Sequence, residues 1–261
     1  STLSSSSAAS DVYKRQVESS GMMDALKRMK PTCIEDIVAL VALYRPGPME
    51  NIPTYCEVKN GLKERESIHP LIDYILEETQ GIIVYQEQVM QIAQVMANYT
   101  LGGADLLRRA MGKKIKKLMD ELKVKFIDGA QKKNNIQPET AKQIYELIEK
   151  FAEYGFNKSH STAYAYVAYQ TAWLKTHYPA EFMSANLTSE MSNIDRVVIL
   201  INECRKMKID VNPPDVNVSS IDFRPVNSNT ISFGLNAIKN VGTKALEQII
   251  ESVSYTHLRA N

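Results

Sequence analysis

Residues 157–160 read Asn-Lys-Ser-His and stand directly before a stretch with a helical pattern. Asn157 or Ser159 could cap that helix, whose start presents free N–H groups and the positive end of the dipole. Lys158 is unfavourable there by roughly a few tenths of a kcal/mol, and an anion bound in front of the helix would offset that cost. Two interpretations stay open: an anion site, or an ordinary helix start with Lys158 exposed and His160 packed.

A second group of cations lies within residues 108–133, which contain ten Lys or Arg against three Asp or Glu. Four of them crowd around the flexible Gly112: Arg108, Arg109, Lys113 and Lys114. The planar arginine fork suits phosphate oxygens, and adjacent arginines on a helix point in different directions. The cluster therefore predicts a footprint for polyanions, with a solvated helix face as the alternative.

The sequence offers no matching set of catalytic or metal-binding residues. Two-metal phosphoryl transfer needs carboxylates held together, often as Asp-x-Asp on a strand, and this pattern is absent from the sequence. The P-loop, HExxH and GxSxG motifs are absent as well. Cys33, Cys56 and Cys204 lie far apart without metal-ligand spacing, and we expect them to be reduced thiols. The sequence thus predicts phosphate-binding groups without a metal site.

The elements that must position these residues are mostly helical. Apolar spacing predicts helices over 34–44, 82–99, 113–133, 141–154, 159–178, 179–191 and 194–207. A further helix is expected after Thr100, which is a suitable N-cap, and Pro48 marks a break that ends the first helix. Aromatic residues surround most of the 159–178 helix. We therefore expect this helix to be buried on most sides, with its aromatic residues in a core rather than stacked on bases.

The pattern changes after residues 212–215, where two prolines interrupt the chain. Residues 222–226 and 230–233 predict a β-hairpin, and 236–240 and 243–250 predict two helices joined by a tight turn. The predicted fold class is mainly α, a multi-helix domain with a small β-hairpin element near the C-terminal end. The longest apolar run, 37–43, is far below the roughly 20 residues that a membrane span needs.

The two ends of the chain differ from the middle. Residues 1–16 are rich in Ser and Ala, and 253–261 interrupt an amphipathic helix without a stop signal. We expect both to be non-native tails around an all-α domain at 17–208 and a short β element with a following helical region at 209–252. The tails carry three cations and one anion, so residues 17–252 have a net charge of −1 and the cationic cluster is local.

Gln86, Glu87 and Gln88 form a third polar group, beside the apolar run that precedes them. Their side chains could contact a substrate, or they could cap and pack a helix. The sequence alone leaves this choice open.

Five longer blocks of the sequence are similar to one known family. They are Ala39–Pro48, Gly81–Ala93, Tyr99–Lys114, Phe151–His160 and Ala168–Met183. In order along the chain they resemble the bacterial replicative DNA polymerase III alpha subunit, a C-family polymerase, and the resemblance covers about 17–252. Most of this segment resembles the fingers domain. Residues 233–242 resemble the beginning of the helix-hairpin-helix region that holds duplex DNA.

The resemblance implies a fragment of a replicative DNA-directed DNA polymerase. In that family the primer 3′-hydroxyl attacks the α-phosphate of the incoming dNTP, and two Mg²⁺ ions are held by palm aspartates upstream of this segment. The chain is therefore expected to hold no catalytic residue and no metal ligand, and to be inactive alone. The implied partners are primer–template DNA, the incoming dNTP and other polymerase III holoenzyme subunits, in the cytoplasm and without a membrane.

Particular residues receive roles from the same resemblance. Arg108 and Arg109 are placed near the triphosphate of the incoming nucleotide. The same nucleotide-facing surface is expected to include Asn157, Lys158, Ser159 and His160. Contacts with DNA or phosphate are implied for four more residues: Lys113, Lys114, Tyr154 and Arg45. Ile115 departs from the lysine of many relatives, which moves charge by one residue. Two alternatives stay open: a stand-alone nucleic-acid-binding helical module without nucleotide chemistry, and a helical scaffold whose charge serves only solvation.

Overall fold

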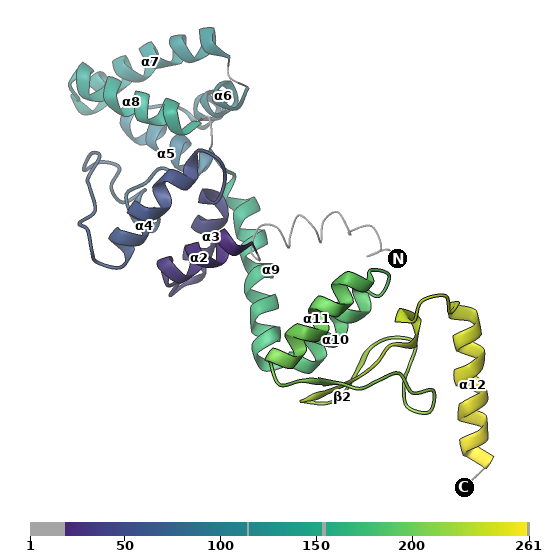
Figure 1. Ribbon diagram of the computed structural model, residues 1–261. Helices are drawn as coiled ribbons and strands as arrows, with labels where there is room; N and C mark the ends of the chain where they lie inside the picture. Colours follow the sequence, from purple (N-terminus) through teal and green to yellow (C-terminus); the bar gives the residue numbers. More distant parts are fainter. Residues whose placement is uncertain (1–18, 114, 153–154, 260–261) are drawn as a thin grey trace. The chain divides into compact units, whose positions relative to one another are not determined.

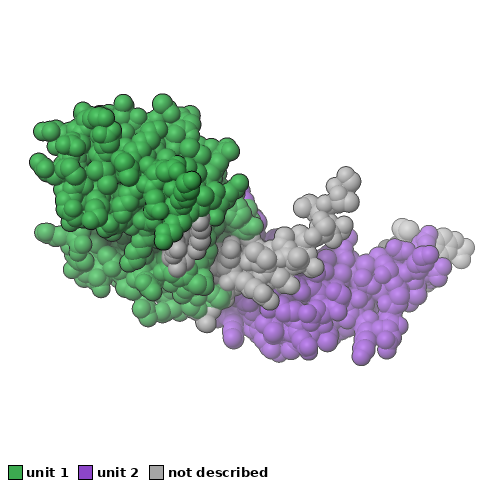
Figure 2. Space-filling view, turned by 90° about the horizontal axis from the view of Figure 1, so that it is seen from above, with its two compact units in different colours: residues 1–168 green, residues 169–261 purple. Residues whose placement is uncertain are grey.

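The computed structural model describes residues 19–113, 115–152 and 155–259 (Figure 1). The chain divides into two compact units, residues 1–168 and 169–261, and each is described by itself (Figure 2). Helices dominate both units, and a small three-stranded sheet lies in the second. The predicted fold class is therefore confirmed, whereas the predicted domain boundary at 208/209 stays a prediction.

Helices and short 3₁₀ turns build the described part of the first unit. They are α2 (Ser20–Met29), α3 (Ile34–Leu43), η1 (Pro48–Asn51), α4 (Ile52–Lys59), η2 (Glu77–Thr79), α5 (Gln86–Ala97), α6 (Leu101–Gly112), α7 (Lys116–Asn134), α8 (Pro138–Ala152) and the first half of α9 (Lys158–His177).

Local signals set several of these boundaries as the sequence predicts. The hydroxyl of Thr100 accepts a hydrogen bond from the backbone N–H of Gly103 at 3.1 Å and so caps α6. The chain leaves α3 through Gly47, whose φ of 97° is a conformation that favours glycine, and Pro48 opens the next turn.

One predicted helix is too long at its start. Residues 82–85 are extended rather than helical, and α5 begins only at Gln86. Tyr85 pairs with Phe156 in an isolated parallel β-bridge, and Ile83, Val84 and Tyr85 are buried. A short apolar run fits a buried extended segment as well as a helix, so its periodicity alone could not separate the two.

Two hydrophobic cores hold the first unit together. In one, α5 packs against α6, α7 and α8 (Figure 1), around the rings of Tyr99, Phe126 and Tyr145. The two buried tyrosines donate their hydroxyls to the backbone carbonyls of Leu122 and Met119, at 2.8 and 2.9 Å. The other core joins α2, α3, α4 and the extended 84–85 segment, with one residue from α9, Ala165.

The described part of the second unit combines the end of α9 and three further helices with the sheet. After the end of α9 come α10 (Pro179–Ser189), α11 (Ile194–Lys206), β1 (Asp210–Val211), β2 (Arg224–Asn227), β3 (Thr230–Ser232), η3 (Leu235–Ala237) and α12 (Thr243–Arg259). The strand order is β1-β3-β2, with β3 antiparallel to β2 and parallel to β1. The predicted hairpin is confirmed, but β1 was not predicted. The predicted helix over 236–240 is wrong, because only a 3₁₀ turn forms there.

The middle of α9 is more exposed than the sequence predicts. Ser161, Ala165 and Ala168 are its buried residues, whereas Tyr166 and Trp173 leave 52% and 42% of their surface exposed. The expectation of a helix buried on most sides is therefore wrong for this structure, since a narrow strip of small residues makes its core contact. No helix among the described residues is both long and apolar enough to span a membrane.

Candidate anion-binding site

The two adjacent arginines of α6 share one carboxylate. Arg108 donates from Nε and Nη2 to Oδ1 of Asp105 at 2.9 and 2.8 Å, and Arg109 donates from Nε to Oδ2 at 2.8 Å. Hydrogen bonding from Arg108, together with the charges of both arginines, holds the pKa of Asp105 below its usual value. Asp105 thus holds two guanidinium groups together and leaves a net positive charge on the group of three.

Gln86 connects Arg108 to the segment that precedes α9. Its Oε1 lies 3.4 Å from Nη1 of Arg108, and its Nε2 donates to the carbonyl oxygen of Gly155 at 3.0 Å. The backbone N–H of Gln86 also donates to the carbonyl oxygen of Phe156 at 2.9 Å, beside the β-bridge of Tyr85. The structure therefore brings the arginine pair and the start of α9 together, although about fifty residues separate them in sequence.

The start of α9 is capped by Asn157. Its Oδ1 accepts the backbone N–H of His160 at 2.9 Å, so Asn157 and not Ser159 fills the cap position. Ser159 and His160 are exposed, although the ring of His160 also packs against its aromatic neighbours Phe156 and Tyr164. The polar groups of this turn are therefore available to a ligand.

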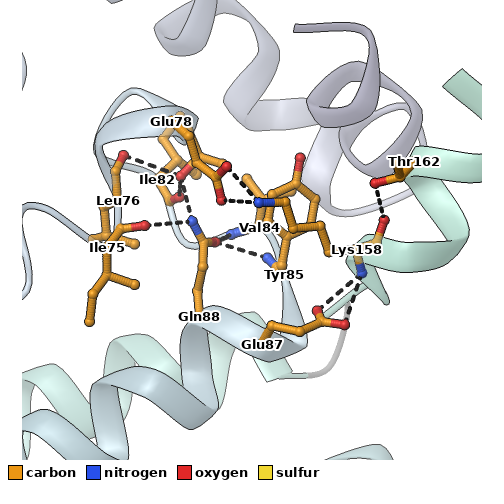
Figure 3. Close-up of polar contacts among 11 residues, drawn as sticks. Ile75, Leu76, Glu78, Ile82, Val84, Tyr85, Glu87, Gln88, Lys158 and Thr162 are labelled. Carbon is orange, nitrogen blue, oxygen red and sulfur yellow. Dashed lines mark hydrogen bonds and ion pairs between the residues drawn. The ribbon is translucent and has the colours of Figure 1, made fainter. Parts of the chain in front are cut away.

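Lys158 is the exception, because two carboxylates of the first unit hold it (Figure 3). Its backbone N–H donates to Oε2 and Oε1 of Glu87 at 3.0 and 3.2 Å. Its Nζ donates to Oε2 and Oε1 of Glu78 at 2.6 and 2.8 Å and lies 5.5 Å from the ring centre of Tyr85. The sequence leaves open an anion site in front of this helix, and in the structure the carboxylate of Glu87 accepts an N–H group there.

Three aromatic rings at the start of α9 lie next to one another: those of Phe156, His160 and Tyr164. The ring centres of Phe156 and His160 lie 5.3 Å apart, and those of His160 and Tyr164 lie 4.5 Å apart. On the other side, the guanidinium of Arg45 lies 3.9 Å from the ring centre of Phe156 and donates to the carbonyl oxygen of Ala42. Burial lowers the pKa of Arg45. Arg45 therefore belongs to the same neighbourhood as the start of α9.

The side chains of Gln86, Glu87 and Gln88 at the start of α5 all make hydrogen bonds within the first unit. Gln88 is 2% exposed; its Oε1 accepts the N–H groups of Val84 and Tyr85, and its Nε2 donates to the Ile75 carbonyl and the Thr79 hydroxyl. Together with the contacts of Gln86 and Glu87 above, this favours the capping and packing alternative that the sequence left open. The side chains of Gln86 and Glu87 contact residues 155–158, and that of Gln88 contacts the 75–85 segment; Figure 3 shows the contacts of Glu87 and Gln88.

The remaining basic residues of α6 and α7 are either exposed or held by partners within the chain. Lys113 is exposed at the end of α6, and Lys116 and Lys117 are exposed at the start of α7. Further along α7, Lys123 pairs with Glu146 and Lys132 with Asp128, as expected of a solvated helix face. Two predicted site residues, Lys114 and Tyr154, lie outside the described residues.

Some site residues were missed by sequence reasoning. Asp105 had a readable signal, since it stands three and four positions before the arginine pair, where helix side chains meet. Glu78 had no such signal, because its partner Lys158 is 80 residues away. Among the described residues, no three His, Cys, Asp or Glu side chains come close enough together to hold a metal ion.

Comparison with known proteins gives two family matches. Residues 6–134 match the finger domain of the bacterial DNA polymerase III alpha subunit, and residues 208–258 match a helix-hairpin-helix motif. Similar proteins include three named DNA polymerase III subunit alpha. That of Haemophilus influenzae is 52% identical over 90% of this chain, that of Pseudomonas aeruginosa 53% over 90%, and that of Escherichia coli K12 50% over 91%. The chain spans 21% of each relative's own length, about a fifth.

Proposed function

Because the chain belongs to the DNA polymerase III alpha subunit family, as a partial chain, we propose that it is the fingers region of a replicative DNA-directed DNA polymerase. Its role is to bind the triphosphate of the incoming dNTP and to hold primer–template DNA during 5′–3′ synthesis. Residues 208–258, which match the helix-hairpin-helix motif, extend this role to duplex DNA.

The observation that carries the proposal is the meeting of the arginine pair with the start of α9 through Gln86. A triphosphate needs several cationic and N–H donors on one surface, and preorganised donors stabilise the charge that develops as pyrophosphate leaves. We assign the nucleotide-facing surface to Arg108, Arg109, Asn157, Lys158, Ser159 and His160, of which the two arginines supply the charged phosphate contacts. Asp105 would release the arginines to phosphate oxygens, which carry more charge than one carboxylate.

Contacts with the phosphates of DNA or nucleotide are proposed around this surface. We assign them to Lys113, Lys114, Tyr154 and Arg45. The exposed position of Lys113 and the closeness of Arg45 to Phe156 support two of these four. Other polymerase III holoenzyme subunits are proposed partners of the parent polypeptide, in the cytoplasm where the bacterial chromosome is copied.

The chemical step requires groups beyond the described residues. Mg²⁺ would supply charge neutralisation for attack of the primer hydroxyl on the α-phosphate. The described residues do not fit that ion, because they contain no cluster of carboxylates able to hold it. We propose that palm aspartates of the parent polypeptide hold the metal and that this chain alone is inactive.

The test is Arg109→Ala in the complete polymerase. Loss of one charge-assisted phosphate contact predicts a rise in the KM for dNTP of about tenfold or more, with little change in the Kd for primer–template DNA. Arg28→Ala is the matched control. Arg28 pairs with Asp24 across one helical turn at 2.8 Å and has 67% side-chain exposure, against 64% for Arg109.

A uniform loss of DNA affinity with an unchanged KM would contradict the nucleotide role and support a stand-alone nucleic-acid-binding module. The salt dependence of DNA binding tests the remaining alternative. Several phosphate contacts predict a log–log slope of several units, whereas a scaffold whose charge serves only solvation predicts no binding even at low salt.

A further inference from the structure

We propose that Glu78 and Glu87 are positioning residues of the nucleotide-facing surface, and that Lys158 serves that surface through them rather than as a phosphate ligand. This inference rests on the proposed function. It assigns a role to two carboxylates that lie 71 and 80 residues before Lys158.

Lys158 donates hydrogen bonds to two carboxylates, one through its backbone and one through its side chain. Glu87 accepts the backbone N–H of Lys158, one of the N–H groups that a helix start leaves without an intrahelical partner. Glu78 accepts the side-chain ammonium through both oxygens, at 2.6 and 2.8 Å. A charged acceptor in front of a helix also interacts favourably with the dipole. Lys158 thus joins the start of α9 to the 78–87 segment at two points.

The segment that carries the two carboxylates is itself held in place by the buried side chains of Thr79 and Gln88. Thr79 is completely buried and donates its hydroxyl to the carbonyl oxygen of Ile82 at 2.6 Å. Gln88 donates to the same hydroxyl at 2.9 Å and to the carbonyl oxygen of Ile75 at 3.1 Å. Buried hydrogen bonds therefore hold the segment from which Glu78 and Glu87 project. The contacts of these two carboxylates with Lys158 can then set the direction in which α9 begins.

Local charge argues against Lys158 as a phosphate ligand. Lys158 contributes one positive charge and the two glutamates contribute two negative charges, so this corner has a net charge of −1. A triphosphate would have to compete with Glu78 for the ammonium and would be repelled by the second carboxylate. The arginine pair of α6 shares a single carboxylate, so that group has a net charge of +1 instead. What Lys158 supplies is the placement of its neighbours Asn157, Ser159 and His160.

A charge swap in the complete polymerase distinguishes a positioning role from direct binding. Lys158→Met and Glu78→Gln should each raise the KM for dNTP by about fivefold, and the double variant should be no worse than either single one. Glu78→Lys combined with Lys158→Glu rebuilds the pair in reverse and should recover most of the loss. A direct phosphate ligand predicts the opposite, because glutamate at position 158 would repel the triphosphate.

The proposal is overturned if Glu78→Gln leaves KM unchanged while Lys158→Met raises it, or if the swapped pair is the worst variant of the set. Lys175 and Glu203 provide the matched control, since this ion pair has side-chain exposures of 40% and 38%, against 39% and 34% for Lys158 and Glu78. Glu203→Gln should leave KM within about twofold.

Hydrogen exchange in the 261-residue chain supplies a readout that needs no nucleotide. Glu87→Ala should speed exchange of the Lys158 amide about tenfold or more, since Glu87 is the acceptor of that N–H. An unchanged rate overturns the positioning role of Glu87. If the exchange result holds but Arg109→Ala leaves the KM for dNTP unchanged, the proposed function fails and the positioning of α9 stands.

Discussion

The side-chain amide of Gln86 donates to the carbonyl oxygen of Gly155 at 3.0 Å, across 69 residues of sequence. This bond, with the backbone bond from Gln86 to Phe156, attaches the loop before α9 to the start of α5. The same side chain faces Arg108. One residue therefore sets the spacing between the arginine pair of α6 and the start of α9 in the proposed nucleotide-facing surface.

Gln86→Ala should lower the free energy of unfolding by about 1 kcal/mol, because it removes the side-chain contacts and keeps the backbone bond. Urea unfolding of the 261-residue chain measures this loss. Gln91→Ala is the control, since Gln91 is exposed on the same helix and should change stability by less than about 0.5 kcal/mol. Equal losses for both variants would show that helix propensity and not the loop attachment explains the effect.

Gln88 should matter more than Gln86, because all four of its contacts are internal. Gln88→Leu keeps the size of the side chain but leaves the N–H groups of Val84 and Tyr85 and the carbonyl of Ile75 without their acceptor and donor. The expected loss is about 3 kcal/mol of unfolding free energy. Thermal and urea unfolding would measure this loss, with Gln91→Leu as the control variant. A loss below about 1 kcal/mol would mean that water or a backbone shift replaces these bonds.

Local chemistry explains which parts of the fold could be predicted from sequence. Thr100 caps α6 because its hydroxyl reaches an N–H three residues later, and the hairpin between β2 and β3 turns at Ser228-Asn229. Both signals lie within one short segment. Asp105 was equally local, and the i,i+3 and i,i+4 rule would have found its contacts with the arginines.

Contacts between residues far apart in sequence explain which features could not be predicted. Residues 82–85 have an apolar pattern that fits a helix, but the backbone of Phe156 and the side chain of Gln88 hold them extended. Nothing near Lys158 in sequence shows that Glu78 and Glu87 will reach it. The candidate cations were therefore predictable as residue types, while their division into paired and exposed groups required the tertiary structure.

Asp36 on α3 offers a test by pH. It is 3% exposed and accepts from the backbone N–H groups of Thr32 and Cys33, from the hydroxyl of Tyr55 and from Lys59 at 2.7 Å. Burial alone would raise the pKa of Asp36, but the hydrogen bonds from Lys59 and from the two backbone N–H groups outweigh it and leave the pKa lowered. The folded state therefore binds this proton less readily than the unfolded state.

The stabilisation from Asp36 should be fully present above the unfolded pKa of about 4 and lost as pH falls through the lower folded pKa. Asp36→Asn should cost about 3 kcal/mol at pH 7, since it leaves the Lys59 ammonium, 10% exposed, without its counter-charge. The difference in unfolding free energy between the unchanged chain and the Asp36→Asn variant should become smaller below about pH 4. Urea unfolding from pH 7 to about 2.5 measures it, with the exposed Asp24→Asn as control. Parallel stability curves would rule out this linkage.

Gly129 marks a close approach between α7 and the end of α5 in the core around Phe126. A Cβ added there would lie 2.2 Å from the carbonyl oxygen of Ala97 and 3.0 Å from its carbon, so α7 could not keep its distance from the end of α5. Asn134 reinforces this contact by donating to the carbonyl oxygens of Val95 and Met96 at 3.0 and 2.7 Å. The glycine is therefore required by backbone packing.

Gly129→Ala should lower the free energy of unfolding by about 2–3 kcal/mol, because overpacking exceeds the gain of about 1 kcal/mol that alanine brings to a helix. Gly102→Ala is the control. Its added Cβ meets no heavy atom of the described residues within 4 Å, so it should stabilise α6 by up to about 1 kcal/mol. Differential scanning calorimetry of both variants should therefore shift Tm in opposite directions. A Tm gain for Gly129→Ala would mean that α5 and α7 can separate without loss, and that their contact does not hold the first core.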